Sequence, residues 1–285
     1  FVVMTYKNII KKTTSNIGYI IINRPKNLNA LNKETIIELN HLIQDFDSNK
    51  NIRSIIITGA EKKAFIAGAD IKEFMFFDQE NGQELAKNGQ VLLFDLIENL
   101  SKPCIAAING FALGGGLERA MSCHIRVASI NSKMGLPEVS LGVIPGYGGT
   151  QRLSQLVGKG KALEMIISGS MISSDDALKW GLVNYVCPQD ELIEKCEYIA
   201  NKISSNSPQA IAKAIKSINS SYSKDGFKTE IELFGSCFGT EEFKEGTNAF
   251  IEKRKPDFQQ FRERRKENVE AYLDGLDNDE NERPN

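Results

Sequence analysis

Short apolar runs bounded by turn-forming residues recur along the first half of the chain. Such runs are typical of strands that are buried in a core. The clearest ones are Ile17 to Asn23, Ser54 to Thr58, Cys104 to Ile108 and Ile125 to Ser129. We therefore predict a strand at each of these four places.

Amphipathic stretches separate these runs. Asn32 is a good cap for a helix whose apolar residues fall on one face, namely Ile36, Leu39, Ile43 and Phe46. A second helix is expected to run through Gln83 to Leu100, and a third to begin at the glycine triplet 114–116. This alternation predicts an α/β layered core in which helices cover parallel strands.

The pattern changes after about Asp190, where only helical periodicity remains. Ser207-Pro208 is a helix start signal, and Pro256 ends the periodic stretch. The residues beyond 258 are charged, and their acidic, polar end is typical of disorder. We expect a core over residues 1–195, a helical region over 196–258 and a charged, partly disordered tail over 259–285.

Composition mainly excludes classes of function. The 285 residues are 41% hydrophobic with a formal net charge of -2, which gives no general reason to expect a nucleic acid or a membrane as partner. No apolar run approaches the length of a membrane span. Five cysteines without CxxC spacing fit free thiols in a reducing cytosol. Met4 is expected to be the natural initiator, without signal-peptide features before or after it, so a cytoplasmic location is predicted.

Glycine-rich segments are the first candidates for a binding site. Gly158-Lys159-Gly160-Lys161 lacks the spacing of a nucleotide P-loop, and no GxGxxG follows a strand. Residues 114–116 lie between a strand and a helix, where free N–H groups suit a developing oxyanion. The same glycines also suit a tight turn with close helix packing, and taken alone that interpretation is favoured.

Two carboxylates follow this triplet. Glu118 falls in the first turn of the predicted helix, and Glu138 comes twenty residues later. Paired carboxylates near hydrogen-bond donors suffice for proton transfer without histidine or metal. His41 and His124 are the two histidines, and neither has a neighbour at metal-ligand spacing, which argues against a histidine-based zinc site. The sequence alone does not show whether the two glutamates meet.

Several segments together resemble the crotonase, or enoyl-CoA hydratase/isomerase, superfamily. The strongest are Ile108 to Glu118, Gly135 to Glu138 and Ile144 to Leu153. Further matches, in the family's order, are Asn23 to Pro25, Leu28 to Leu31, Ala64 to Lys72, and Glu245-Gly246 through Lys253 to Pro256. The likeness runs from about Tyr6 to Phe258 and is closest to bacterial short-chain enoyl-CoA hydratase.

The resemblance implies a crotonase-like spiral of repeated strand–strand–helix units, with C-terminal helices that assemble homotrimers or homohexamers. It implies a hydro-lyase that adds water reversibly to 2-trans-enoyl-CoA, giving 3-hydroxyacyl-CoA, in fatty acid metabolism by β-oxidation. Coenzyme A would enter as part of the acyl-CoA substrate, and no metal, other cofactor, nucleic acid or membrane is expected.

The resemblance also assigns residues. Glu118 and Glu138 match the two hydratase carboxylates, and the N–H groups of Ala69 and Gly115 match those that hold the thioester oxygen. Gly146 matches a backbone position near the attacking water. The remaining matches would line the path of coenzyme A: Lys26, Leu28, Ala30, Ala67, Gly68, Asp70, Ile71 and Lys72.

Two residues depart from the family pattern. Arg119 stands where an apolar residue, often leucine, is usual, and its guanidinium would either stabilise ionised Glu118 or point away and pair elsewhere. His124 stands where many relatives carry aspartate, and we interpret it as structural. An enoyl-CoA isomerase, which needs mainly the second carboxylate, and a noncatalytic CoA-binding or RNA-binding relative remain as alternatives.

Overall fold

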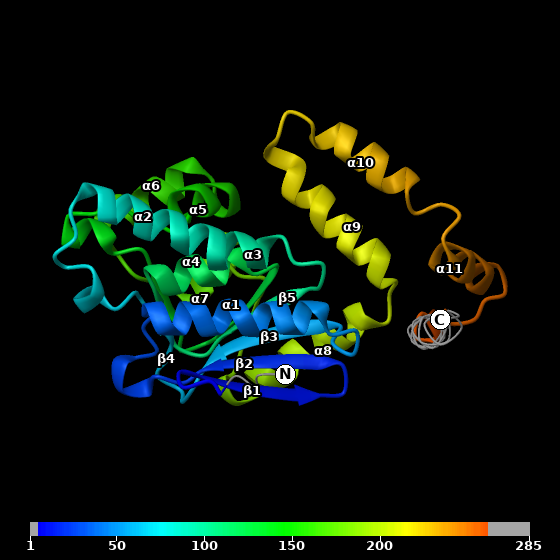
Figure 1. Ribbon diagram of the computed structural model, residues 1–285, viewed down its shortest axis with the longest axis horizontal. Coiled ribbons are helices and arrows are strands. Elements are labelled where there is room, and N and C mark those ends of the chain that lie inside the picture. The colour runs from blue at the N-terminus through cyan, green and yellow to red at the C-terminus, as the bar shows by residue number, and fades with distance from the viewer. Residues whose placement is uncertain (1–4, 262–285) are drawn as a thin grey trace, which may run out of the picture. The chain divides into compact units, whose positions relative to one another are not determined.

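The computed structural model describes residues 5–261, which form two compact units that divide between Ile203 and Ser204. The first unit holds a six-stranded sheet in the order β1-β2-β3-β5-β7-β10 (Figure 1). Its strands are β1 (Ile9–Thr14), β2 (Ile17–Ile22), β3 (Ser54–Gly59), β5 (Cys104–Ile108), β7 (Ile125–Ser129) and β10 (Tyr185–Cys187). All four predicted strands are confirmed within one residue.

Both faces of this sheet are covered. From β2 onwards the strands pair in parallel, and successive side chains of a strand point to opposite faces. In β3, Ile55 and Ile57 join the main core, whereas Ile56 packs in a second cluster that includes Leu192 and Cys196 of α8 (Leu192–Ser204). This arrangement is why the central strands are apolar along their whole length.

A second, four-stranded sheet has the order β4-β6-β8-β9. Its strands are very short: β4 (Ala64–Ala67), β6 (Phe111–Leu113), β8 (Lys133–Gly135) and β9 (Ile172–Ser173). β4 and β6 pair in parallel with Ala67 opposite Leu113. This register brings the segments that follow the two strands, 68–70 and 114–116, side by side.

The helices of the first unit begin largely where the sequence predicts. Asn32 caps α1 (Lys33–Ser48) by accepting a hydrogen bond from the Thr35 N–H. The predicted second helix is α2 (Gln79–Gly89), which continues into a π-helical turn, η3 (Gln90–Phe94), and then α3 (Asp95–Glu98). The glycine triplet opens α4 (Gly115–Ser122). Further along are α5 (Gly149–Val157), α6 (Lys159–Ser168) and α7 (Ser174–Lys179).

Short 3-10 turns join these elements. They are η1 (Pro25–Asn27), η2 (Ile71–Glu73), η4 (Glu138–Leu141), η5 (Gln189–Glu191) and, in the second unit, η6 (Ser220–Tyr222). After β10 every described element is helical, as the sequence predicts. The core unit extends through most of α8, because that helix packs on the sheet, whereas the sequence places the domain boundary at 195.

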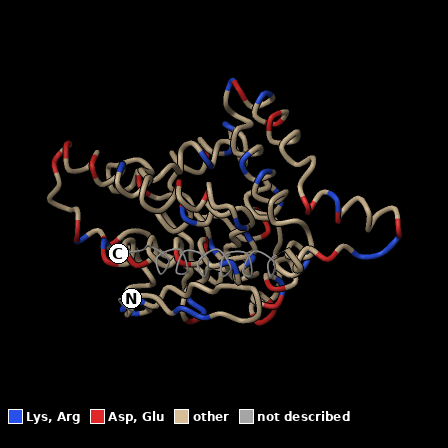
Figure 2. The backbone as a smooth tube through the Cα atoms, turned by 45° about the vertical axis from the view of Figure 1, so that its right-hand side comes forward, with Lys and Arg blue, Asp and Glu red and all other residues tan. Residues whose placement is uncertain are grey.

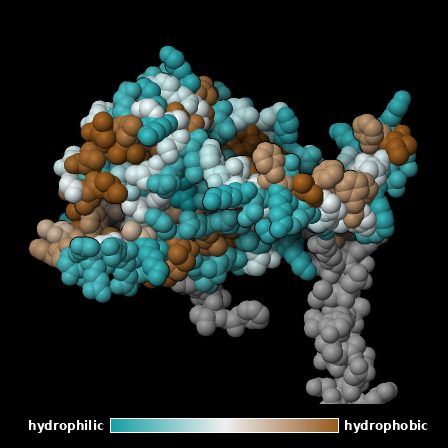
Figure 3. Space-filling view, turned by 90° about the horizontal axis from the view of Figure 1, so that it is seen from above, coloured by the Kyte–Doolittle hydropathy of each residue, from teal (hydrophilic) through white to brown (hydrophobic). Residues whose placement is uncertain are grey.

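The second unit contains α9 (Pro208–Asn219), α10 (Gly226–Gly235) and α11 (Glu241–Ile251). Ser207 caps α9 and Pro208 is its first residue, as predicted. Large hydrophobic side chains stand exposed on these helices (Figure 3), among them Phe227, Ile231, Phe234, Phe250 and Ile251. None of the described helices combines the length and apolar character needed to cross a membrane. Apart from residues 259–261, the predicted charged tail lies outside the described residues.

Candidate active site

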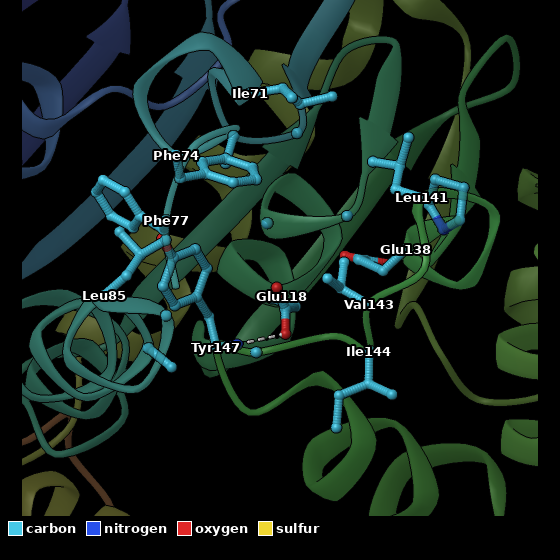
Figure 4. A pocket seen from close by; sticks show the side chains of 18 of the residues that line it. Ile71, Phe74, Phe77, Leu85, Glu118, Glu138, Leu141, Val143, Ile144 and Tyr147 are labelled. Atoms are coloured by element: carbon cyan, nitrogen blue, oxygen red, sulfur yellow. Dashed lines mark hydrogen bonds between the residues drawn. The ribbon is translucent and has the colours of Figure 1, made fainter. Parts of the chain in front are cut away.

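A cavity of about 500 Å³ opens between the α2 region, the N-terminus of α4 and the 137–147 segment (Figure 4). Its walls contain the four residues predicted to be catalytic, Ala69, Gly115, Glu118 and Glu138. It is also lined by Gly146, predicted to lie near the attacking water, and by three of the predicted coenzyme A residues, Ala67, Gly68 and Ile71. The structure therefore brings segments that lie far apart in the sequence to one site.

Two backbone N–H groups meet at one end of the cavity. Gly115 is the first residue of α4, so its N–H has no partner within the helix. Leu31 bonds to the carbonyl of Gly68 and to the N–H of Asp70, which leaves the intervening Ala69 N–H directed away from Leu31. A Cβ atom at Gly115 would lie 3.8 Å from the Ala69 nitrogen, so the two amides are close neighbours.

The other glycines of the triplet permit this close approach. Gly114 has a φ of +51°, and a Cβ there would lie 2.9 Å from Glu138 Oε1. A Cβ at Gly116 would lie 1.9 Å from the Ile66 carbonyl oxygen, so α4 packs directly on the backbone of β4. The sequence leaves two interpretations of the glycine triplet open, close helix packing and free N–H donors. The structure shows both at once.

Glu118 is almost completely buried, at 1% exposure. Its Oε1 accepts hydrogen bonds of 2.8 Å from the Tyr147 and Gly149 N–H groups. Burial, reinforced by the charge of Glu138, raises the pKa of Glu118 to about 7, although the two backbone hydrogen bonds act in the opposite direction. A carboxyl that titrates near neutral pH is suited to proton transfer.

Glu138 begins η4 and faces the same cavity. Its Oε2 is buried and has no hydrogen-bond partner among the described residues. Burial raises the pKa of Glu138 above its ordinary value. An unpartnered carboxyl oxygen in a cavity is positioned to exchange a proton with a ligand.

The rest of the predicted coenzyme A path does not line this cavity. Lys26 is exposed and borders a separate polar depression with Arg24. Leu28 and Ala30 accept hydrogen bonds through their carbonyls, from the Ala67 N–H and from Arg24 respectively. Asp70 forms an ion pair with Arg24 at 3.1 Å. None of these four residues, nor exposed Lys72, is part of the cavity walls.

Sequence reasoning missed much of the apolar lining. Leu85 and Ala86 of α2, Leu113 of β6, Leu141 at the end of η4, and Val143 and Ile144 after it contribute to the walls. Phe74, Phe77 and Tyr147 also border the cavity, whereas Phe76 is 88% exposed and does not. Leu113 and Ile144 lie within family motifs that assign no role to their side chains, and the other missed residues lie outside these motifs.

The two departures from the family pattern point away from the carboxylates. Arg119 is fully buried, and its Nη1 lies 3.3 Å from Ser122 Oγ and 3.7 Å from Cys123 Sγ. Of the two alternatives for Arg119, the structure therefore supports the outward orientation. His124 Nδ1 accepts a hydrogen bond of 2.9 Å from the Cys104 N–H, and burial lowers its pKa. This structural role agrees with the sequence interpretation.

Charged residues elsewhere in the described part of the chain give no second candidate site. Lysine and arginine are interspersed with aspartate and glutamate along the described chain (Figure 2). Within residues 5–261 no group of three or more histidine, cysteine, aspartate or glutamate side chains is arranged to hold a metal ion.

Comparison with known proteins identifies the family. Residues 12–263 match the model of the enoyl-CoA hydratase/isomerase family. The chain belongs to this family. It is 46% identical to a short-chain-enoyl-CoA hydratase of Clostridium acetobutylicum, over 88% of this chain and 97% of that protein. It is 42% identical to a crotonyl-CoA hydratase of Syntrophomonas wolfei, over 90% of this chain and 99% of that one.

The likeness extends to the fold. A crystal structure of an enoyl-CoA hydratase from Bacillus anthracis superposes with a TM-score of 0.83 at 38% identity, covering 88% of this chain and 99% of that one. The family match and this superposition confirm the crotonase-like fold that the sequence motifs predict.

Proposed function

We propose that this protein is an enoyl-CoA hydratase, which adds water reversibly across the double bond of 2-trans-enoyl-CoA. The observation that carries the proposal is the combination in one cavity of two raised-pKa carboxyls, Glu118 and Glu138, with two adjacent backbone donors, Ala69 and Gly115. The family and the named hydratase relatives support the same activity.

The proposed mechanism assigns the amides to the thioester oxygen. When water adds to C3, negative charge develops on that oxygen as the thioester becomes enolate-like. The N–H groups of Ala69 and Gly115 would stabilise this charge by donating hydrogen bonds to the oxygen. Because both donors belong to the backbone, they are fixed before the substrate arrives.

The two carboxyls divide the proton transfers. Two N–H groups already bond to Glu118 Oε1, which favours its ionised form, so we assign it to remove the proton from water. Glu138 has an unpartnered, buried oxygen, which favours its protonated form, so we assign it to deliver the proton to C2. Since the two groups interact, the pair titrates jointly, and the pH–rate profile reports apparent pKa values of the pair.

Substrate and setting follow from the same site. Coenzyme A enters as part of the substrate, with Lys26, Leu28, Ala30, Asp70 and Lys72 proposed to contact it outside the reacting end. The relatives' names support a short acyl chain. We propose a cytoplasmic enzyme of fatty acid β-oxidation without a metal or further cofactor.

We further propose that the protein is a homotrimer or homohexamer assembled through α9 to α11. Exposed Phe227, Ile231 and Phe234 support this proposal, because contiguous apolar surface usually marks an interface. Light scattering of the intact protein tests it, and a monomeric mass would reject it.

The activity is tested by following the loss of the conjugated enoyl thioester when crotonyl-CoA is added. Glu118→Gln and Glu138→Gln should each lower kcat by about 10²- to 10⁴-fold, and the double variant should be little worse than the poorer single one. Glu84→Gln, on the exposed side of α2, is the matched control and should retain full activity. Near-normal hydration by either active-site variant contradicts the mechanism, and isomerisation without hydration would make the protein an isomerase.

A further inference from the structure

The helix that runs from α2 into α3 contains a π-helical turn at Gln90–Phe94. Such turns are rare and occur frequently at functional sites, because the extra residue redirects the side chains around it. Leu93 and Phe94 of this turn are buried in the core, whereas Gln90 is half-buried and points to a neighbouring loop.

The neighbouring loop is the segment 145–149, whose N–H groups at Tyr147 and Gly149 donate hydrogen bonds to Glu118. One turn of helix makes three contacts with it. Gln90 Nε2 donates a hydrogen bond of 2.8 Å to the Gly146 carbonyl. The rings of Phe94 and Tyr147 stack with centroids 4.9 Å apart. Gly89 lies directly against the same ring, since a Cβ there would be 2.2 Å from Tyr147 Cε1.

The contact of Gln90 has a consequence for Glu118 through peptide geometry. The Gly146 carbonyl and the Tyr147 N–H belong to one planar peptide unit, in which they point in opposite directions. Holding the carbonyl from one side therefore fixes the direction of the N–H on the other. That N–H donates the hydrogen bond of 2.8 Å to Glu118 Oε1.

Besides the packing of the Tyr147 ring on Gly89 and Phe94, few contacts restrain this peptide. It contains Gly146, Gly148 and Gly149, and Gly148 has a φ of +90°, so its backbone is intrinsically free. Arg152 Nη1 donates to the Tyr147 carbonyl at 3.0 Å, which anchors the next peptide unit but not the one that faces Glu118. Gln90 is the side chain that anchors the Gly146 carbonyl.

We propose that Gln90 is a positioning residue for the hydration: it fixes the Gly146–Tyr147 peptide and thereby aims Glu118 at the attacking water. This inference rests on the proposed function and deepens it. Gln90 lies outside the cavity walls, so it acts through the backbone and does not touch the substrate. A misplacement of a reacting group by about 1 Å can cost about 10²-fold in rate.

The test replaces Gln90 by methionine, which has a similar length but no donor. In full-length Gln90→Met, we expect kcat for crotonyl-CoA hydration to fall by roughly tenfold, since the Gly149 N–H still holds Glu118. KM should change little. The acidic limb of the kcat/KM profile should move to higher pH, because the Tyr147 hydrogen bond lowers the pKa of Glu118. Asn88→Met, at an exposed position of α2, is the control and should match the wild type.

A second variant separates positioning from simple structural support. In Gln90→Glu the protonated side chain can donate to the Gly146 carbonyl, whereas the carboxylate cannot. Activity relative to the wild type should therefore fall as pH rises through the titration of the new carboxyl. A purely structural role would instead lower the melting temperature and the fraction of active protein without moving either pH profile, and that result would overturn the proposal.

A readout independent of turnover keeps the two proposals distinguishable. The infrared carboxyl band of Glu118, assigned by its loss in Glu118→Gln, gives the titration of that group directly. An upward shift of this titration in Gln90→Met supports the positioning role even if the wild type hydrates no enoyl-CoA, in which case only the proposed function fails. An unshifted band together with wild-type kcat refutes the role of Gln90.

Discussion

Replacing Arg119 by leucine should stabilise the protein, although arginine is the larger side chain. The guanidinium is fully buried, and within residues 5–261 its Nε and Nη2 have no hydrogen-bond partner. Each buried polar group left unsatisfied costs about 1–3 kcal/mol. Removing two such groups would stabilise the fold by about 2–6 kcal/mol. Losing the hydrogen bond to Ser122 would cost about 1 kcal/mol, and the cavity left by the smaller side chain would cost about 1–2 kcal/mol more. Taken at the middle of these ranges, the net gain is about 1–2 kcal/mol, in the same direction as other replacements of buried ionic groups by apolar ones.

The gain should depend on pH because of the thiol beside Arg119. Burial raises the pKa of Cys123, but the hydrogen bond from Cys104 and the charges of Arg119 and Arg126 more than offset this and lower it to about 7. His124 nearby has a lowered pKa, and Glu98 pairs with Arg152. A thiol whose pKa is lower in the folded state stabilises it at high pH, and this contribution is lost as pH falls through about 7. The thiolate can then balance the guanidinium only above that pH.

The assay is urea unfolding of wild type, Arg119→Leu and Arg119→Lys at pH 6 and pH 8.5, with the denaturant slope checked for constancy. The free energy of unfolding of Arg119→Leu should exceed that of the wild type most at pH 6. The lysine control should show no such gain, because a charge stays buried. The acidic limb of the pH–rate profile should barely move, since Arg119 faces Ser122 and Cys123. A leucine variant less stable than the wild type at pH 6 would show that the unpaired guanidinium nitrogens do not destabilise the fold.

Two further predictions concern the backbone and the buried acid. Gly116→Ala should destabilise the protein by about 1–3 kcal/mol and lower hydration, because its Cβ would clash with the Ile66 carbonyl and push Gly115 away; Gly160→Ala, with open space around it, is the control in both assays. The raised pKa of Glu118 means that its contribution to stability is complete below about pH 4.5 and is lost as pH rises through about 7. Between these two pH values the free energy of unfolding of Glu118→Gln should therefore rise relative to that of the wild type, by up to about 3 kcal/mol. A difference that stays constant across this pH range would contradict the raised pKa of Glu118.

The sequence predicts the larger sheet well because burial alone determines its strands. β5 and β7 match the expected ranges since every residue of β5 and most of β7 are buried. The second sheet escapes prediction for the opposite reason. Its strands have two to four residues, too few for a period to show, and they form only because pairing with distant segments satisfies their backbone.

In the active site, too, the sequence predicts some residues and misses others. Glu118 and Glu138 are identified from motifs that are continuous in sequence, and the structure places both in one cavity. The apolar walls come from separate elements, such as Leu85 on α2 and Val143 after η4, so no local pattern marks them. The anchoring of the Gly146 carbonyl by Gln90 depends on a π-helical turn that periodicity reads as ordinary helix.

The register of two strands, and not any side chain, determines where the two backbone N–H donors of this site lie. β4 and β6 pair with Ala67 opposite Leu113, and two residues beyond each lie Ala69 and Gly115. Any side chain at Gly116 would separate α4 from β4 and so separate these two amides. The stabilisation of the enolate-like thioester is thus tied to the fold itself, whereas proton transfer depends on two carboxyls whose pKa values follow from their local contacts. Sequence change can therefore tune the acid–base chemistry of this cavity while the oxyanion site persists, as long as the register and the glycine at 116 are kept.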